Sequence, residues 1–192
     1  MSVSARPAKA TRILGIDPGS RVTGWGVVDC EPRGLRFVAC GTIRTAPGAD
    51  LGARLRTIHD AVRALCSEHA PDEVAVERAF VSDNADTALK LGQARAAAIC
   101  GTFDHGPTLH EYAPATIKQA VVGSGAATKE QVQHMVRALL AVRDKLAFDA
   151  SDALAAAVCH AHGRGLKSRY AAVLGATRAA KHSGGLRRGR RR

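Results

Sequence analysis

Two short apolar segments, each closed by an acidic residue, constrain the fold of this chain more than any other feature. Residues 12–17 (RILGID) end at Asp17, and residues 73–77 (EVAVE) end at Glu77. Short runs rich in Ile, Leu and Val are typical of buried strands. Between them, apolar residues recur at intervals of three and four from 50 to 69, which indicates an amphipathic helix. Strands that alternate with helices in this way predict an α/β protein.

The remaining sequence divides into further strands and helices. A turn at 18–20 separates the first strand from a candidate strand at 22–30. A second turn, near 32–34, separates that strand from a candidate strand at 35–42. The other predicted elements are, in order, a helix at 84–103, a strand at 108–112, and helices at 114–122, 128–141 and 149–162. Asn84 is the expected N-cap of the first of these helices. Thr128 and Gln131 form a capping box at the start of the helix at 128–141. This order predicts a five-stranded mixed β-sheet flanked by α-helices, with an antiparallel meander followed by parallel strands.

Charge divides the chain into a nearly neutral body and a basic tail. Of its 28 Lys and Arg residues, ten lie between 163 and 192, where there is no Asp or Glu. The other 18 basic residues and all 17 acidic residues lie in residues 1–162, which therefore carry a net charge of only +1. We therefore expect a flexible leader over 1–10, a folded domain over 11–162, and a disordered basic tail over 163–192. Such a tail has affinity for nucleic acid but supplies no sequence specificity.

Neither the apolar runs nor the cysteines point to a membrane or an exported protein. The longest apolar run is the seven residues 153–159, far below the ~20 that a membrane span requires. The first ten residues lack the apolar stretch of a secretory signal. Five scattered cysteines without a C-x-x-C pair indicate reduced thiols and a cytoplasmic protein. A zinc site at Cys159, His160 and His162 is disfavoured, because their spacing does not place them on one helical face.

Four acidic residues are placed where an α/β sheet forms its sites. Asp17 and Glu77 close two strands, while Asp149 and Asp152 share one face at the start of the last predicted helix. Carboxylates that converge repel one another, and oxygen donors without Cys or His select Mg²⁺ or Mn²⁺. Two such ions activate a water and stabilise the leaving 3′ oxygen of a phosphodiester, which is nuclease chemistry. Turn residues and helix-start acids explain the same positions, so spacing alone leaves both interpretations open.

Several longer blocks carry a more specific signal. In order, they are residues 14–24 (LGIDPGSRVTG), 76–80 (VERAF), 84–95 (NADTALKLGQAR), 117–123 (IKQAVVG), 129–136 (KEQVQHMV) and 149–155 (DASDALA). Together they resemble the RuvC family of bacterial crossover (Holliday) junction endodeoxyribonucleases over residues 12–162. The resemblance implies a ribonuclease H-like fold and structure-specific cleavage of Holliday junctions in recombination and DNA repair.

The same resemblance implies a cofactor, ligands and partners. It assigns metal binding to Asp17, Glu77, Asp149 and Asp152, with two Mg²⁺ ions expected in each subunit and Mn²⁺ able to substitute. It implies a homodimer that makes paired symmetric nicks with 5′-phosphate and 3′-hydroxyl ends. It also implies a RuvA–RuvB branch-migration complex as a partner.

Five further residues are expected to contact DNA. Lys118 and Lys129 match family lysines that face the DNA backbone near the site, where they would bind the scissile phosphate or its developing charge. Phe80 matches an aromatic residue that stacks on an unpaired base at the crossover, and such stacking is worth ~1–3 kcal/mol. Arg78, next to Glu77, and Arg21, in the turn after Asp17, are the other two.

Three other classes of function fit parts of the sequence. An actin-like or sugar-kinase-like ATPase can open with the same strand and turn, but its second phosphate turn and its adenosine loop are missing. Residues 122–128 (VGSGAAT) contain a G-x-G, although the third position of a dinucleotide fingerprint is Thr128 and the segment lies between helices. A non-catalytic junction-binding module would have no need of all four acids.

Overall fold

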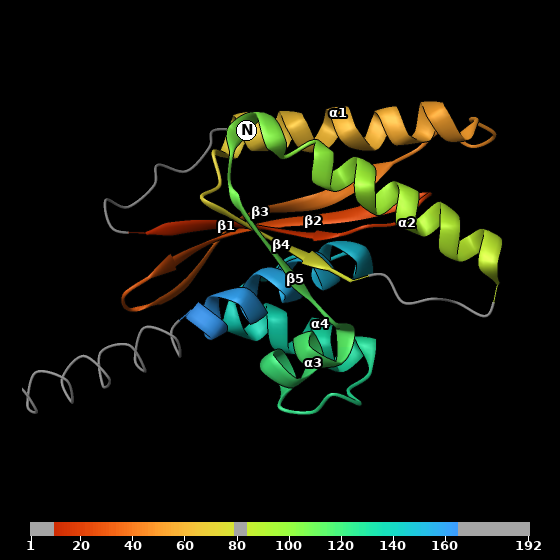
Figure 1. Cartoon of the computed structure of the whole chain (residues 1–192). Helices are drawn as coiled ribbons and strands as arrows, with labels where there is room; N and C mark the ends of the chain where they lie inside the picture. Colours follow the sequence, from red (N-terminus) through yellow and green to blue (C-terminus); the bar gives the residue numbers. More distant parts are fainter. Residues whose placement is uncertain (1–9, 79–83, 165–192) are drawn as a thin grey trace, which may run out of the picture. The chain divides into compact units, whose positions relative to one another are not determined.

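A five-stranded mixed sheet forms the centre of the computed structural model (Figure 1), which describes residues 10–78 and 84–164. Its strands are β1 (Thr11–Asp17), β2 (Val22–Glu31), β3 (Gly34–Arg44), β4 (Glu73–Glu77) and β5 (Thr108–Tyr112), in the spatial order β3-β2-β1-β4-β5. The first three strands pair antiparallel, whereas β4 and β5 add in parallel. The predicted α/β class, mixed sheet and strand count are confirmed.

Two helices cover one face of the sheet. α1 (Leu51–His69) begins at Asp50, whose side chain accepts a hydrogen bond from the Ala53 N–H. α2 (Ala85–Cys100) begins at Asn84 as predicted, but it ends three residues before the expected position, and a 3₁₀ turn (Phe103–His105) follows. The C-cap is Gly101, a poor helix former, and it packs closely on α1, since a Cβ at this position would lie 2.6 Å from the His59 oxygen.

Three helices cover the other face. They are α3 (Pro114–Val122), α4 (Lys129–Leu139) and a helix over residues 148–164, called helix 148–164 below. The Thr128–Gln131 capping box is present at the start of α4. The loop with the G-x-G sequence joins α3 to α4, so it does not follow a strand as a dinucleotide site requires.

Alternation along the strands produces two hydrophobic cores. Leu14, Ile16 and Val76 pack on the side of α1 and α2. Ile13 and Ala75 face the side of α3, α4 and helix 148–164. Successive side chains of a strand point to opposite faces, so Asp17 and Glu77 belong to the same face as Ile13 and Ala75.

Glycines bring helix 148–164 close to the sheet. A Cβ at Gly15 would lie 2.0 Å from the Ala153 oxygen, and one at Gly24 would lie 1.9 Å from the Asp149 oxygen. Any larger residue at either position would push the helix away. Because Gly24 pairs with Asp17 across β1 and β2, this approach sets the start of the helix against the end of β1.

A buried ion pair fastens the opposite end of the sheet. The Arg12 guanidinium donates to both carboxylate oxygens of Asp29, at 2.8 and 3.0 Å, and to the His69 carbonyl. Arg36 also bonds Asp29. In the described part of the chain no helix is long and apolar enough to cross a membrane. Residues 1–9, 79–83 and 165–192, and with them most of the expected leader and tail, lie outside that part.

Candidate functional site

Asp17 and Glu77 end two neighbouring strands on one face of the sheet. β1 and β4 run parallel, with Ile16 opposite Val76, so both strands finish at the same edge. The two acids follow these buried residues and project towards helix 148–164. Asp152 lies in the first turns of that helix. The convergence predicted from the sequence is therefore present.

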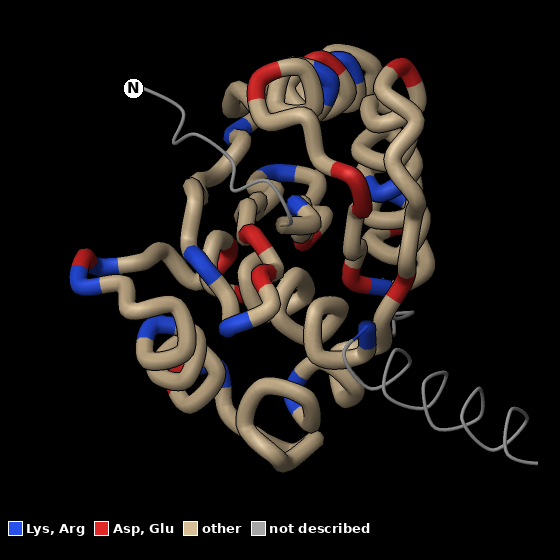
Figure 2. Tube along the Cα trace, turned by 90° about the vertical axis from the view of Figure 1, so that its left-hand side faces the viewer, with Lys and Arg blue, Asp and Glu red and all other residues tan. Residues whose placement is uncertain are grey.

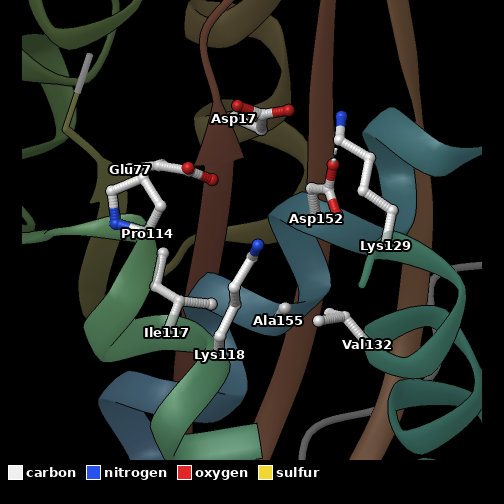
Figure 3. Close-up of a pocket in the computed structure, with 9 residues that line it drawn as sticks. All are labelled: Asp17, Glu77, Pro114, Ile117, Lys118, Lys129, Val132, Asp152 and Ala155. Carbon is white, nitrogen blue, oxygen red and sulfur yellow. Dashed lines mark ion pairs between the residues drawn. The ribbon is translucent and has the colours of Figure 1, made fainter. Parts of the chain in front are cut away.

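A cavity of about 200 Å³ lies where these elements meet (Figure 3). Its lining residues come from β1, β4, α3, α4 and helix 148–164: Asp17, Glu77, Pro114, Ile117, Lys118, Lys129, Val132, Asp152 and Ala155. Three carboxylates and two lysines form its polar part, and apolar side chains of α3 and α4 form its floor. The apolar floor, which the sequence did not single out, restricts water around the acids.

Burial and mutual repulsion make the two strand-end acids hard to ionise. Burial is the main cause that raises the pKa of Asp17 to about 8, and the charges of Glu77, Asp152 and Asp149 add to it. Burial, with the charge of Asp152, raises the pKa of Glu77 to about 7. A carboxylate in this state is strongly stabilised by a nearby cation.

Lys129 supplies part of that positive charge. Its Nζ lies 3.4 Å from Oδ2 of Asp152, an ion pair drawn as a dashed line in Figure 3. The charge of Asp152, with smaller contributions from Asp17 and Asp149, raises the pKa of Lys129. Lys118 points into the cavity in the same view, and its charge opposes the rise in the pKa of Glu77. Both lysines predicted to lie at the site are there.

Asp149 lies beside the cavity, although it does not line it. It is half-buried at the start of helix 148–164, and its charge raises the pKa values of Asp17 and Asp152. Asp152 is three residues further along the same helix. The four acids thus form one interacting group, in which four carboxylates face only two lysine ammonium groups.

The donor set fits a hard divalent cation. All four acidic groups offer oxygen, and neither Cys nor His is among the described residues that line the cavity. Mg²⁺ and Mn²⁺ favour such ligands. Burial and, to a smaller extent, the neighbouring carboxylates raise the pKa values of Asp17 and Glu77, and a bound cation would favour their ionised forms. The residues present therefore fit the metal-binding role expected of them.

The other predicted DNA-contacting residues have different surroundings. Arg78 is exposed, and its Nε lies 4.0 Å from Oε2 of Glu111, which also pairs with Arg95. Arg21 is exposed and lines a second cavity of about 560 Å³, together with Arg44 and Arg54. Neither the pairing of Arg78 with Glu111 nor the grouping of Arg21 with Arg44 and Arg54 was predicted from the sequence. Phe80 lies outside the described residues, and its stacking role stays a prediction.

A second group of potential metal ligands lies away from the cavity. Atoms of Glu73, His110 and His160 come within 4.8 Å of one another. His160, however, is hydrogen-bonded through Nε2 to Glu73 at 2.5 Å and through Nδ1 to the Tyr112 hydroxyl at 2.6 Å. Two ligand atoms each ~2.0 Å from a tetrahedral zinc ion would lie ~3.3 Å apart. The contacts are therefore those of a buried hydrogen-bond network.

The neighbouring Cys159 does not join His160 in a metal site. Its thiol is directed to the Thr116 carbonyl at 3.8 Å. The zinc interpretation of this segment, already disfavoured by spacing, gains no support from these contacts.

The sheet order and the placement of the acids define a class of protein. A mixed sheet with carboxylates at two adjacent strand ends, and two more on a helix packed against them, is the arrangement of the ribonuclease H-like nucleases. The family model for crossover junction endodeoxyribonuclease RuvC matches residues 13–160. The chain belongs to this family.

Known relatives resemble the chain over most of its length. The RuvC protein of Halorhodospira halophila is 58% identical over 154 residues, which cover 80% of this chain and 92% of that relative. The RuvC protein of Aromatoleum aromaticum is 54% identical over 160 residues, 83% of this chain and 86% of the relative. Among solved structures, Thermus thermophilus RuvC in complex with a Holliday junction substrate has a TM-score of 0.76 at 32% identity, covering 82% of this chain and 96% of that chain.

Proposed function

We propose that this chain is a structure-specific endodeoxyribonuclease that resolves Holliday junctions in recombination and repair. One observation carries the proposal: Asp17, Glu77, Asp152 and Asp149 form a single acidic group at the edge of a ribonuclease H-like sheet. The family to which the chain belongs acts on crossover junctions, as its name states. An intact acidic group argues against a module that binds junctions without cutting them.

The four acids would hold the metal, and the two lysines would hold the substrate. We expect two Mg²⁺ ions in each subunit, with Mn²⁺ able to replace them. When bound, such ions activate the attacking water and stabilise the leaving 3′ oxygen. Lys118 and Lys129 reach into the cavity from α3 and α4, where their ammonium groups can bind the scissile phosphate. The apolar floor limits access of bulk water, which strengthens these interactions.

Resolution of a junction requires two nicks, and a two-fold symmetric enzyme delivers them. We propose a homodimer in which each subunit presents one acidic group to one of two equivalent strands. Hydrolysis would leave 5′-phosphate and 3′-hydroxyl ends that a ligase can join. As for the family, we expect a RuvA–RuvB branch-migration complex to act with it.

The remaining expectations concern the ends of the chain and its location. We propose that residues 11–162 form the catalytic domain, preceded by a short leader. The basic residues of 163–192 would add affinity for DNA that does not depend on sequence. The reduced cysteines and the DNA substrate favour a cytoplasmic enzyme.

A comparison of two DNA substrates tests this proposal. The purified protein is incubated with a synthetic mobile four-way junction and with a linear duplex of the same sequence, each with Mg²⁺ and with EDTA. We expect paired nicks in the junction alone, only with Mg²⁺, and products that ligase seals.

Two outcomes would count against it. Tight junction binding without cleavage in Mg²⁺ or Mn²⁺ would indicate a binding module. Equal cleavage of junction and duplex would indicate a nuclease without structure specificity.

A further inference from the structure

The nearly neutral body of the protein raises the question of how it holds a polyanion beside an acidic site. Residues 1–162 carry a net charge of only +1. Figure 2 shows basic and acidic positions spread over all layers of the described chain. Affinity for DNA near the acidic group must therefore come from local clusters of positive charge in addition to Lys118 and Lys129.

One such cluster surrounds the second cavity. Arg21, Arg44 and Arg54 line it, with the backbone of the loop between β3 and α1. None of these three arginines lies within 4.0 Å of a carboxylate in the parts of the chain that the structure describes. Asp50, at the end of this loop, is engaged as the N-cap of α1. Three guanidinium groups around one cavity without a paired acid have the charge and the hydrogen-bond donors to bind an anion.

Hydrogen bonds fix the framework that carries the arginines. The Thr45 N–H donates to the Arg21 carbonyl at 3.1 Å, and the Thr45 hydroxyl reaches the Ser20 and Arg21 carbonyls, both at 3.3 Å. Arg54 donates from Nε to the Ala49 carbonyl at 2.9 Å. The turn after β1 and the loop after β3 are thereby joined, which fixes the backbone at Arg21 and the side chain of Arg54 before a ligand arrives.

The cavity lies along the same edge of the sheet as the acidic group. Gly24 pairs with Asp17 on β1 and with Thr42 on β3, and Arg44 follows Thr42 by two residues. Arg44 therefore stands on the same face as Asp17, two strands away and two residues along. Neighbouring strands lie ~4.8 Å apart and successive residues rise by ~3.3 Å, so the Cα atoms of Asp17 and Arg44 are about 12 Å apart. Successive phosphates of one strand are separated by ~3.4 Å along the helix axis and by more along the backbone itself, so that distance spans at most about four nucleotides.

We propose that Arg21, Arg44 and Arg54 form a second phosphate site, which binds the junction backbone within about four nucleotides of the scissile phosphate. The inference rests on the proposed function. The site fixes the direction in which a junction arm leaves the acidic group, and it supplies affinity without reading bases. Its role is to position the substrate, since the cavity contains none of the four acids.

The salt dependence of junction binding tests the site. Binding is measured in an Asp17→Asn background, so that cleavage does not consume the junction. Each phosphate contact contributes about 0.9 to the slope of log K against log [salt]. Replacing the three arginines with Gln should lower that slope by about two to three. An Arg21→Gln/Arg44→Gln double variant, which keeps the Arg54–Ala49 hydrogen bond, should lower it by about two.

A second triple variant controls for the loss of net charge. Arg33, Arg56 and Arg63 lie in the β2–β3 turn and on α1, outside both cavities. Their replacement with Gln removes the same charge and should change the slope by less than one. Thermal unfolding of all variants confirms that each is folded.

Neutral phosphates in the DNA locate the contact. A methylphosphonate is placed at each of the first six positions on either side of the cut. In the parent protein, binding should weaken at one or two of the first four positions on one side, and this sensitivity should vanish in the arginine triple variant. An unchanged salt slope, or unchanged sensitivity at that position, would overturn the arginine site. A parent protein that does not prefer the junction over a duplex would instead overturn the proposed function.

Discussion

Replacing Asp17 with Asn should stabilise the metal-free protein, and the gain should grow as the pH rises. In the folded protein the pKa of Asp17 is raised to about 8, chiefly by burial and then by its acidic neighbours. In the unfolded chain the same group titrates near 3.9. Between pH 5 and pH 7 the folded protein therefore holds a proton at Asp17 that the unfolded chain has already released.

The linkage between proton binding and folding sets the magnitude. Where the folded state binds one proton more than the unfolded state, the free energy of unfolding falls by about 1.4 kcal/mol for each unit rise in pH. From pH 5 to pH 7, Asp17 alone thus costs the wild-type protein about 2.7 kcal/mol. Asn does not titrate and carries no charge, so this loss is absent from the variant.

Urea denaturation in EDTA at pH 5, 6 and 7 measures the difference. The single tryptophan, Trp25 in β2, packs against the core and reports unfolding by its fluorescence. The free energies of wild type and variant should diverge by about 1.4 kcal/mol per pH unit. Mg²⁺ should restore stability to the wild type and less so to the variant, because bound ligand stabilises the folded state. Free energies of unfolding that change in parallel with pH, or a variant less stable than wild type at pH 7, would show that Asp17 does not retain a proton in the folded protein.

Three further substitutions test the contact of Gly24 with helix 148–164, the role of Lys129, and the buried ion pair of Arg12 with Asp29. Gly24→Ala places a methyl group 1.9 Å from the backbone oxygen of Asp149 and should displace helix 148–164. We expect single-turnover cleavage to fall about 100-fold, the effect of a ~1 Å misplacement. An unchanged cleavage rate would show that the helix position does not matter for cleavage. Lys129→Gln should lower cleavage at saturating junction by about 10²–10³-fold, and a change confined to the dissociation constant would show that this lysine only binds DNA. Asp29→Ala leaves the Arg12 guanidinium buried and without its carboxylate partner, so the free energy of unfolding in urea should fall by about 3–5 kcal/mol. A loss below about 1 kcal/mol would mean that water takes the place of the Asp29 carboxylate beside Arg12.

Local sequence patterns predicted most elements because their signals lie within each segment. β4 and β5 begin and end where the sequence analysis placed them, since apolar runs and adjacent Pro and Gly residues define both. The predicted end of α2 was three residues too late. The Ala-rich pattern ends at Cys100 and the helix ends with it, at the C-cap Gly101. Glycine is a poor helix former, so the signal for this end is present in the sequence.

The acidic group could be predicted for a related reason. Asp17 and Glu77 end runs with the same alternation, so two parallel neighbours must bring them to one edge. The pKa values could not be predicted, because they depend on the apolar floor from α3 and α4 and on the ion pair of Lys129 with Asp152.

The arginine cavity depends on strand register as well. Arg21 and Arg44 are far apart in the sequence and meet because Val22 pairs with Arg44 across β2 and β3. Register of this kind is set by the whole sheet. The buried network of His160, Glu73 and Tyr112 escaped prediction for the same reason, since its members come from three separate elements.

We propose that the acidic group performs cleavage and that other residues hold the junction. Wild type and Asp17→Asn are compared on one labelled four-way junction, with binding measured in EDTA, where no cleavage occurs, and single-turnover cleavage measured in Mg²⁺. We expect cleavage by the variant to be reduced by more than about 10³-fold, since removal of an essential catalytic group has effects of this size, with a dissociation constant within about threefold of wild type. Cleavage at the wild-type rate, or loss of binding together with cleavage in a folded variant, would contradict it.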